Sequence, residues 1–241
     1  MNRLPFLLIP VILLSMTASD TSSPRPRILV FSRTAGFRHS SIPDGKKALL
    51  EMGKKEGFLA DTTEDAGFFT REKLKEYKAV VFLNTSGNVL DSAQQVSFEE
   101  YIHSGGGFAG VHAATDTEYD WPWFNRLAGA RFSDHPKPQE ALLRKTEEIH
   151  PATSGLPPVW TRFDEWYNFK DMVSGIRPLL LLDEKSYVGG KHGDFHPVAW
   201  YRPFEGGRSF YTALGHTAES YREPLFLTHL LGGIRYAAGL P

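Results

Sequence analysis

The stretch AVVFLNTSGNVLDSAQQVSFEEYIHSGGGFAGVHA, residues 79–113, contains the pattern from which the fold class follows. It begins with an apolar run, 79–84, which is typical of a strand buried on both faces of a sheet. Asp91 then caps a segment whose apolar residues suit a helix packed on a sheet, and residues 107–113 form a second strand-like run. Strand, helix and strand in this order predict a right-handed connection between two parallel strands.

The same alternation extends in both directions from this stretch. Towards the N-terminus, we expect a strand at 28–32 and helices at 43–57 and 70–77. Towards the C-terminus, short apolar runs separated by Gly, Pro and Asp predict strands at 140–145, 178–183, 196–202 and 206–214, before a terminal helix at about 223–238. The predicted fold is a three-layer α/β domain with a mainly parallel sheet and antiparallel strands late in the chain.

Length and composition favour a single domain, which we place at 28–241. A chain of 241 residues with 41% hydrophobic residues can bury one sizeable core. The 27 basic and 28 acidic residues give a formal charge of -1 and are scattered along the chain. No overall field attracts polyanions or lipid headgroups, so we expect neither nucleic-acid nor membrane partners. The oligomeric state is left open.

The N-terminus predicts export. Residues 1–20, MNRLPFLLIPVILLSMTASD, combine one arginine, an apolar run and a zone of small residues, as a cleavable signal peptide does. A retained N-terminal anchor is the alternative. Residues 21–27 are proline-rich and polar, and we expect a flexible tether there. The chain has no cysteine and therefore no disulfide and no thiol nucleophile. We expect a periplasmic or secreted protein.

Residues 105–110 match the pattern G-x-G-x-x-G, which in dinucleotide-binding proteins cradles a pyrophosphate. Such a loop has to follow a strand and begin a helix, whereas these glycines follow a helix and precede a strand. We therefore expect no nucleotide binding. At the other end of that strand, His112 occupies the strand-to-loop position that presents a reactive side chain above the sheet edge. Alternatively, His112 simply ends the strand and bonds a nearby carbonyl.

Six blocks together resemble the ThuA-like family, named after trehalose utilisation. They are RTAGFRHSSIPDG, GGGFAGVHAATDT, FDEWYNF, HPVAWYR, GGRSFYTALGHTAESY and HLLGGIRYAAG, which occur in this order from about residue 27 to 239. The resemblance implies a flavodoxin-like sheet similar to that of class I glutamine amidotransferases. Those enzymes carry a cysteine where this chain has His112, so amide hydrolysis through a thioester is excluded.

The resemblance also implies site residues at one edge of the sheet: His39, His112, Glu165 and His216 as catalytic residues, and Arg33, Asp116 and His196 as substrate-binding residues. Aromatic residues beside acidic ones are typical of sugar sites, so we also expect Asp164, Trp166 and Tyr167 to bind substrate, with sealing of the core as the alternative for the aromatic residues. Imidazoles and a carboxylate that share one cleft can move protons near neutral pH. For Trp121 and Trp123, stacking on a sugar and sealing the core are equally favoured. We expect surface or packing roles for His103 and His229, and the loop position of His192 and His196 does not match a helical zinc motif.

Three functions are compatible with these residues. The first, implied by the resemblance, is an enzyme of carbohydrate catabolism that transfers a proton next to the carbonyl of a keto-sugar or 3-keto-glycoside, as an isomerase or a lyase. The second is a metal-dependent hydrolase in which His39, His112 and His216 with a carboxylate hold a divalent ion. The third is a non-catalytic sugar-binding module. We expect no cofactor, although a divalent metal stays open, and the expected partner is a small carbohydrate.

Overall fold

The computed structural model describes residues 24–241 of the chain. The predicted signal peptide at 1–20 and the first part of the predicted tether lie outside the described residues. Strand β1 (Arg27–Phe31) begins one residue earlier than expected, because the Arg27 backbone already pairs with Leu59, and the Arg27 guanidinium also donates to Asp61 Oδ2 at 2.7 Å. Arg27 therefore belongs to the folded domain rather than to the tether. None of the helices in 24–241 has the length and apolar character needed to cross a membrane.

A nine-stranded sheet forms the middle layer, in the order β2-β1-β3-β4-β11-β10-β9-β6-β7. The first five strands in this order pair in parallel, and each later pairing is antiparallel. The predicted fold class is thus confirmed. Besides β1, the strands are β2 (Leu59–Thr63), β3 (Ala79–Leu83), β4 (Gly107–Val111), β6 (Gln139–Lys145), β7 (Val159–Asp164), β9 (Arg177–Asp183), β10 (Pro197–Phe204) and β11 (Gly207–Thr212).

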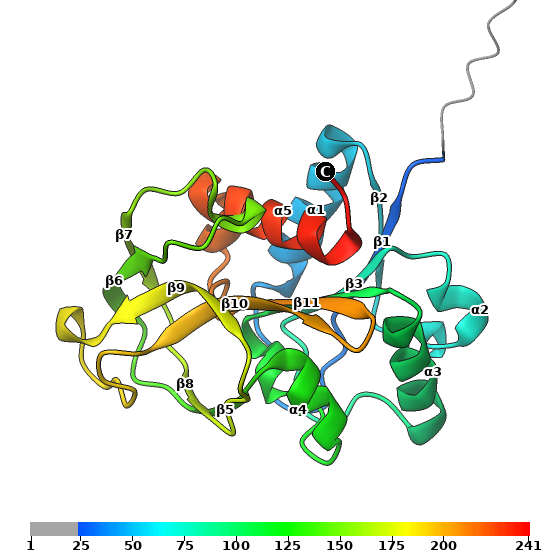
Figure 1. Cartoon of the computed structure of the whole chain (residues 1–241), viewed down its shortest axis with the longest axis horizontal. Coiled ribbons are helices and arrows are strands. Elements are labelled where there is room, and N and C mark those ends of the chain that lie inside the picture. Colours follow the sequence, from blue (N-terminus) through cyan, green and yellow to red (C-terminus); the bar gives the residue numbers. More distant parts are fainter. Residues whose placement is uncertain (1–23) are drawn as a thin grey trace, which may run out of the picture.

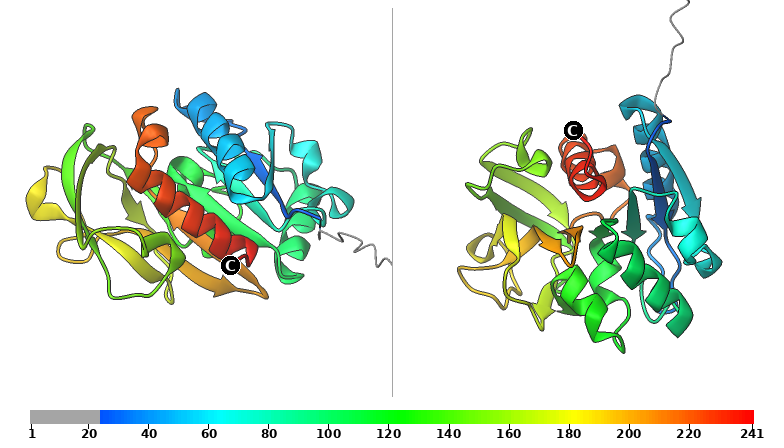
Figure 2. Two further views of the ribbon diagram at one scale, coloured as in Figure 1. Left: turned by 90° about the horizontal axis from the view of Figure 1, so that it is seen from above. Right: turned by 45° about the vertical axis from the view of Figure 1, so that its right-hand side comes forward.

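Helices cover both faces of the sheet and complete the three layers. Figure 1 shows α1 (Ile42–Glu56) and α5 (Pro224–Ala238) on one face, and α3 (Ser92–His103) and α4 (Pro122–Ala128) on the other. The helix predicted at 70–77 is only the short α2 (Arg71–Leu74). The antiparallel half of the sheet curves, so that β6 and β7 lie beside α5 on the side opposite to α1 (Figure 2).

Local sequence signals explain the central connection. Asp91 accepts from the backbone N–H of Gln94, and the Gln94 side chain accepts from the Asp91 N–H, which is a complete capping box at the start of α3. The glycines after α3 lie in the turn before β4, as expected. Gly107 allows β4 to approach α5 closely, because a Cβ there would lie 1.9 Å from the Ala237 carbonyl oxygen.

The strand order shows where a ligand is expected, at the carboxyl ends of the strands. The chain passes from β1 to β2 on one side and from β3 to β4 on the other, so the strand order reverses between β1 and β3. In open α/β sheets, ligands bind beside such a reversal, at the carboxyl ends of the strands. The loops after β1, β3, β4 and β11 all leave the sheet at this edge.

Candidate active site at the carboxyl edge of the sheet

Four predicted site residues lie together at this edge. His39 comes from the loop after β1, His112 directly follows β4, Glu165 directly follows β7, and His216 lies in the loop after β11. One nitrogen or carboxylate oxygen from each lies within 4.8 Å of the corresponding atoms of the other three. We call these four residues the His–Glu cluster. Side chains that are far apart in the sequence therefore share one site.

His112 has both a strained backbone and a defined hydrogen bond. Its φ of +49° lies in the left-handed region that favours glycine, and it turns the chain from β4 into the 3-10 helix η2 (His112–Asp116). Its fully buried imidazole donates from Nδ1 to the carbonyl oxygen of Ala213 at 2.7 Å. In a neutral ring this assignment leaves the lone pair on Nε2, which lies 3.2 Å from His216 Nδ1. The bond from His112 to a nearby carbonyl, which was the alternative to a reactive role, is therefore present. The same bond directs Nε2 into the cluster.

Glu165 is the anionic centre of the cluster. Its Oε2 lies 3.2 Å from His216 Nδ1 and 3.4 Å from His112 Nε2. Its Oε1 lies 3.1 Å from Nδ1 of His135, a half-exposed residue that the sequence reasoning did not single out. His135 follows β5 (Arg131–Asp134), which pairs with β8 (Asn168–Lys170) outside the main sheet. The only sequence signal for it was a histidine just after a short, largely polar segment.

The environment separates the proton affinities within the cluster. Burial, together with the neighbouring His112 and His216, lowers the pKa of His39 to about 3. Burial also opposes the charged form of His216, but the hydrogen bond and charge of Glu165 outweigh burial and raise the pKa of His216. For Glu165, burial favours the neutral acid, but the hydrogen bonds and charges of His112 and His216 outweigh it and hold the carboxyl pKa well below its usual range. One imidazole therefore stays neutral while another is favoured as a cation.

The same atoms fit a divalent metal ion. The three distances that link His112 Nε2, His216 Nδ1 and Glu165 Oε2 are 3.2, 3.4 and 3.2 Å. Neighbouring ligands around a tetrahedral zinc ion, with bonds of about 2.0–2.1 Å, lie about 3.3 Å apart. The hydrogen bond from His112 Nδ1 to a backbone carbonyl is also the usual support of a metal-bound imidazole. The His–Glu cluster is thus a candidate metal centre as well as a candidate acid–base site.

Aromatic rings line the cluster. The ring centroid of Tyr167 lies 4.2 Å from that of His112. The His135 ring also stacks on Tyr167, with the centroids 6.1 Å apart. Phe37 is 67% exposed, and its ring centroid is 4.9 Å from that of His39. The polar cluster therefore has an apolar surround of the kind that binding pockets use.

Three residues predicted to bind substrate are fully buried around the cluster. Asp164 is fully buried and uses both oxygens to accept backbone N–H groups. Trp166 is fully buried, and its indole N–H donates to the carbonyl of Gln139. His196 is fully buried, and its Nε2 donates to the backbone carbonyl of Tyr167 at 2.8 Å. Their polar atoms are paired inside the protein, which favours packing and positioning, and their predicted substrate contacts stay predictions.

Arg33 and Asp116 lie at the same edge but outside the cluster. Arg33 is exposed in the loop after β1. Asp116 is half-buried at the end of η2 and accepts from the Tyr119 hydroxyl at 2.6 Å; burial raises its pKa. Across 24–241, no hydrogen bond or ion pair joins either side chain to the cluster, so their predicted substrate contacts stay predictions.

The remaining candidates pack away from the edge. Trp121 and Trp123, at the start of α4, stack on each other at 5.0 Å, and their N–H groups donate to Glu99 of α3 and to Glu205 in the turn between β10 and β11, which favours the core-sealing interpretation. His103 is half-exposed beside Glu205, and the buried His229 bonds the Ala152 carbonyl, as their predicted surface and packing roles require. His192 accepts from the Phe169 N–H and holds a loop.

The fold and the cluster define the class: an α/β domain of the class I glutamine amidotransferase-like type with a His–Glu cluster at the strand-to-loop position. The chain belongs to the ThuA family, described as trehalose utilisation, whose family model matches residues 27–237. A carbohydrate-related role follows from this membership. No sequence among the curated proteins matches the chain.

Solved structures agree with the family. A ThuA-like protein from Bacteroides uniformis ATCC 8492 shares 26% identity over 92% of this chain and 94% of its own, with a TM-score of 0.76. A ThuA-like protein from Parabacteroides merdae ATCC 43184 shares 21% identity over 90% and 91% of the two chains, with a TM-score of 0.75. A cytoplasmic protein from Salmonella typhimurium LT2 shares only the fold, at 12% identity, coverage of 88% and 99%, and a TM-score of 0.64.

Proposed function

We propose that this chain is an enzyme of carbohydrate catabolism that acts on a keto-sugar or a 3-keto-glycoside, and that the His–Glu cluster moves a proton at the carbon next to the carbonyl. Family membership supports the carbohydrate. The 3.2 Å contact between Nε2 of His112, which carries the lone pair of a neutral ring, and His216, whose pKa Glu165 raises, supports the chemistry. A lone pair beside an imidazole whose acid form is stabilised is the arrangement of an acid–base pair.

In this reaction, His112 and His216 have different roles. Nε2 of His112 is the base and takes the proton from carbon, while the C–H electrons form a carbon–carbon double bond. His216, whose cation Glu165 stabilises, gives a proton to the carbonyl oxygen, which becomes the hydroxyl of an enediol. His112 then returns the proton to the former carbonyl carbon, and the other enediol hydroxyl gives its proton back as it becomes the new carbonyl of the isomer. Alternatively, the enediol hydroxyl gives its proton back to His216 as the ketone re-forms, and an oxygen substituent two carbons from the carbonyl leaves with the proton held by His112, which gives an unsaturated ketone and an alcohol.

Solvent deuterium exchange tests this reaction directly. We would incubate the protein with a panel of 3-keto-glycosides in D₂O and follow the hydrogens next to the carbonyl, and any product, by proton NMR. His112→Ala should lower the exchange rate by about a hundredfold or more, since it removes the general base. His103→Ala is the matched control, because this histidine is half-exposed and bonded to Glu205 away from the cluster.

The outcomes separate the proposal from a binding module. Exchange or product with any member of the panel, lost in His112→Ala, supports catalysis. Binding of a panel sugar without exchange, with equal affinity in the wild type and His112→Ala, contradicts the proposal and favours a non-catalytic sugar-binding protein.

A metal-dependent hydrolase is the second candidate, favoured by the three interatomic distances of the cluster. In that case a divalent ion held by the cluster would polarise a water molecule or a sugar oxygen. Elemental analysis of the protein, with turnover measured before and after a chelator, decides between the two candidates. One equivalent of metal, lost in His39→Ala together with hydrolysis, would replace the metal-free proposal.

We also propose that the protein is exported to the periplasm or the medium, and that its partner is a small carbohydrate rather than a nucleic acid or a membrane. The composition of residues 1–20 supports export. N-terminal sequencing of the mature protein should start near residues 18–21, and an intact Met1 would contradict export.

A further inference from the structure

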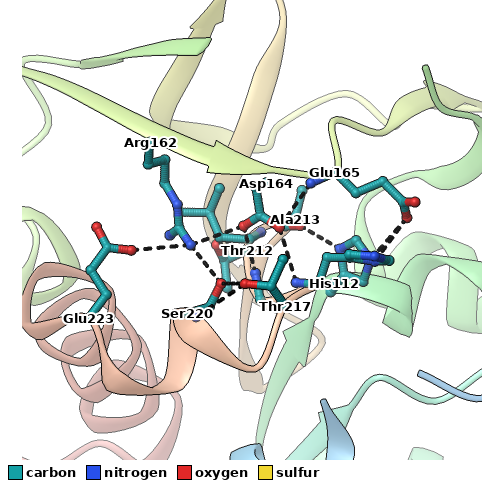
Figure 3. A network of polar contacts seen from close by, with 12 residues as sticks. His112, Arg162, Asp164, Glu165, Thr212, Ala213, Thr217, Ser220 and Glu223 are labelled. Carbon is teal, nitrogen blue, oxygen red and sulfur yellow. Dashed lines mark hydrogen bonds and ion pairs between the residues drawn. The ribbon is translucent and has the colours of Figure 1, made fainter. Parts of the chain in front are cut away.

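A single buried carboxylate joins β7 to the loop after β11. The two strands are separated in the sheet by β10, β9 and β6. Nevertheless, Asp164 at the end of β7, which Figure 3 labels, accepts from the backbone N–H of Gly215 at 3.0 Å through Oδ2 and from that of His216 at 3.1 Å through Oδ1. The curved antiparallel half of the sheet is thereby tied back to the parallel half, at the edge where the cluster lies.

The same carboxylate holds a second cluster residue. Asp164 Oδ1 also accepts from the backbone N–H of Glu165 at 2.9 Å. One fixed group thus sets the starting points of the Glu165 and His216 side chains, whose Oε2 and Nδ1 meet at 3.2 Å. Asp164 itself is fully buried with its oxygens occupied, so it acts on the cluster through these backbones.

Arg162 forms an ion pair with Asp164 and joins it to the segment before α5. The buried guanidinium places Nη2 3.1 Å from Asp164 Oδ2, donates to the Ser220 hydroxyl at 2.8 Å and lies 3.3 Å from Glu223 (Figure 3). Ser220 belongs to the 3-10 helix η5 (Glu219–Arg222), and Glu223 precedes α5. The ion pair therefore connects the cluster to the segment that follows His216.

Stability alone does not account for this arrangement. Burying an ion pair removes two charges from water, and replacing such a pair by apolar side chains is often neutral or stabilising. Here Nε and Nη1 of Arg162 find no hydrogen-bond partner in the described chain, so part of its desolvation is uncompensated. A geometric role at the neighbouring cluster gives a reason for such a pair.

We propose that Asp164 is a positioning residue, which holds Glu165 and His216 at hydrogen-bond distance by gripping the backbones of both. For its effect on rate, this inference rests on the proposed function; its effect on geometry does not. A positioning group changes turnover more than substrate affinity, because it acts on the reacting geometry rather than on a substrate contact.

The test uses Asp164→Ala, which removes both acceptors, and the milder Asp164→Asn, which keeps one carbonyl oxygen. For 3-keto-glycoside exchange, we expect Asp164→Ala to lower kcat about 10- to 100-fold with KM changed less than about threefold, and Asp164→Asn to be intermediate. Crystal structures of both variants provide the second readout. The Glu165 Oε2 to His216 Nδ1 separation should exceed hydrogen-bond length in Asp164→Ala.

Glu118→Gln is the matched control. Glu118 is also a buried carboxylate that fixes a loop, since its Oε1 accepts from the N–H groups of Val89 and Leu90 at 2.7 and 2.8 Å, but within 24–241 no hydrogen bond or ion pair joins it to the cluster. Its variant should lose stability while kcat and the cluster geometry stay as in the wild type.

Three results would overturn the inference. The first is a folded Asp164→Ala protein in which the separation between Glu165 Oε2 and His216 Nδ1 is the same as in the wild type. If Asp164→Ala does not fold, the same result in Asp164→Asn counts instead. The second is an equal loss of kcat in Glu118→Gln. The third is a rise in KM at constant kcat. If no sugar is turned over, the proposed function fails, and the crystallographic distance still decides whether Asp164 positions the pair.

Discussion

The positive φ of His112 predicts that glycine is more stabilising than alanine at this position, whereas alanine is normally the more stabilising of the two in regular structure. Its φ is +49°, a value at which a Cβ crowds the following carbonyl. His112→Gly and His112→Ala remove the same imidazole and the same hydrogen bond to Ala213, so those losses cancel in the comparison. The two variants then differ in the Cβ and in the freedom of the unfolded chain.

The two terms have opposite signs. A left-handed conformation costs a non-glycine residue about 1–2 kcal/mol, which glycine avoids. Glycine in turn loses more entropy on folding, by about 0.5–1 kcal/mol relative to alanine. The difference predicts that His112→Gly is more stable than His112→Ala by about 0.7 kcal/mol. Neither variant should turn over a keto-sugar, since both lack the base.

Urea unfolding of both proteins, followed by circular dichroism, measures this difference. Ala109→Gly is the control, because Ala109 is fully buried in the middle of β4. There the glycine variant should be the less stable one by about 1 kcal/mol or more. An alanine variant at His112 that is as stable as the glycine variant would refute the strain at this turn.

The remaining predictions concern charge and packing. Glu165→Gln should move the alkaline limb of the pH profile of kcat to lower pH, because His216 loses the group that raises its pKa and its acid form is lost sooner as pH rises; an unmoved limb contradicts the pairing. Burial lowers the pKa of His150 and of His229 to about 4, so the unfolded chain binds more protons between pH 6.5 and 4. The free energy of unfolding should therefore fall over that window as the pH is lowered in urea titrations, and a flat profile would argue against neutral buried imidazoles. Trp166→Phe should lower stability by about 1–2 kcal/mol through the lost hydrogen bond to Gln139 and leave KM for a keto-glycoside unchanged; a raised KM would return Trp166 to the substrate site.

The fold was predictable where apolar runs alternate with a capped helix. The runs that became β3, β4 and β11, and the segment that became α5, carry this pattern clearly. Strand β2 was missed because LADTT is short and mostly polar, and it is held by pairing with β1 rather than by its own burial. Its stability is a property of the sheet, which local sequence does not display.

Part of the site was predictable from the positions of residues just after strands, but the sequence neighbours of Glu165 were not. Residues just past strands were expected at one edge, and His39, His112 and His216 are found there. Asp164 and Trp166 were grouped with Glu165 because they adjoin it in sequence. Successive side chains in an extended chain point to opposite sides, so the neighbours of a residue that faces the cluster face the interior.

The charge balance of the cluster explains how three histidines coexist in one buried site. Glu165 offsets one positive charge. The raised pKa of His216 favours that charge on the His216 imidazole. A second proton on His39 is opposed by its burial and by the neighbouring imidazoles, and the pKa of about 3 expresses that opposition. The proposed proton transfer uses the His216 cation as the acid and the lone pair of His112 Nε2 as the base, and the neutral His39 adds no competing positive charge. Asp164 then matters because the raised pKa of His216 depends on its 3.2 Å contact with Glu165, and a looser contact would lower that pKa.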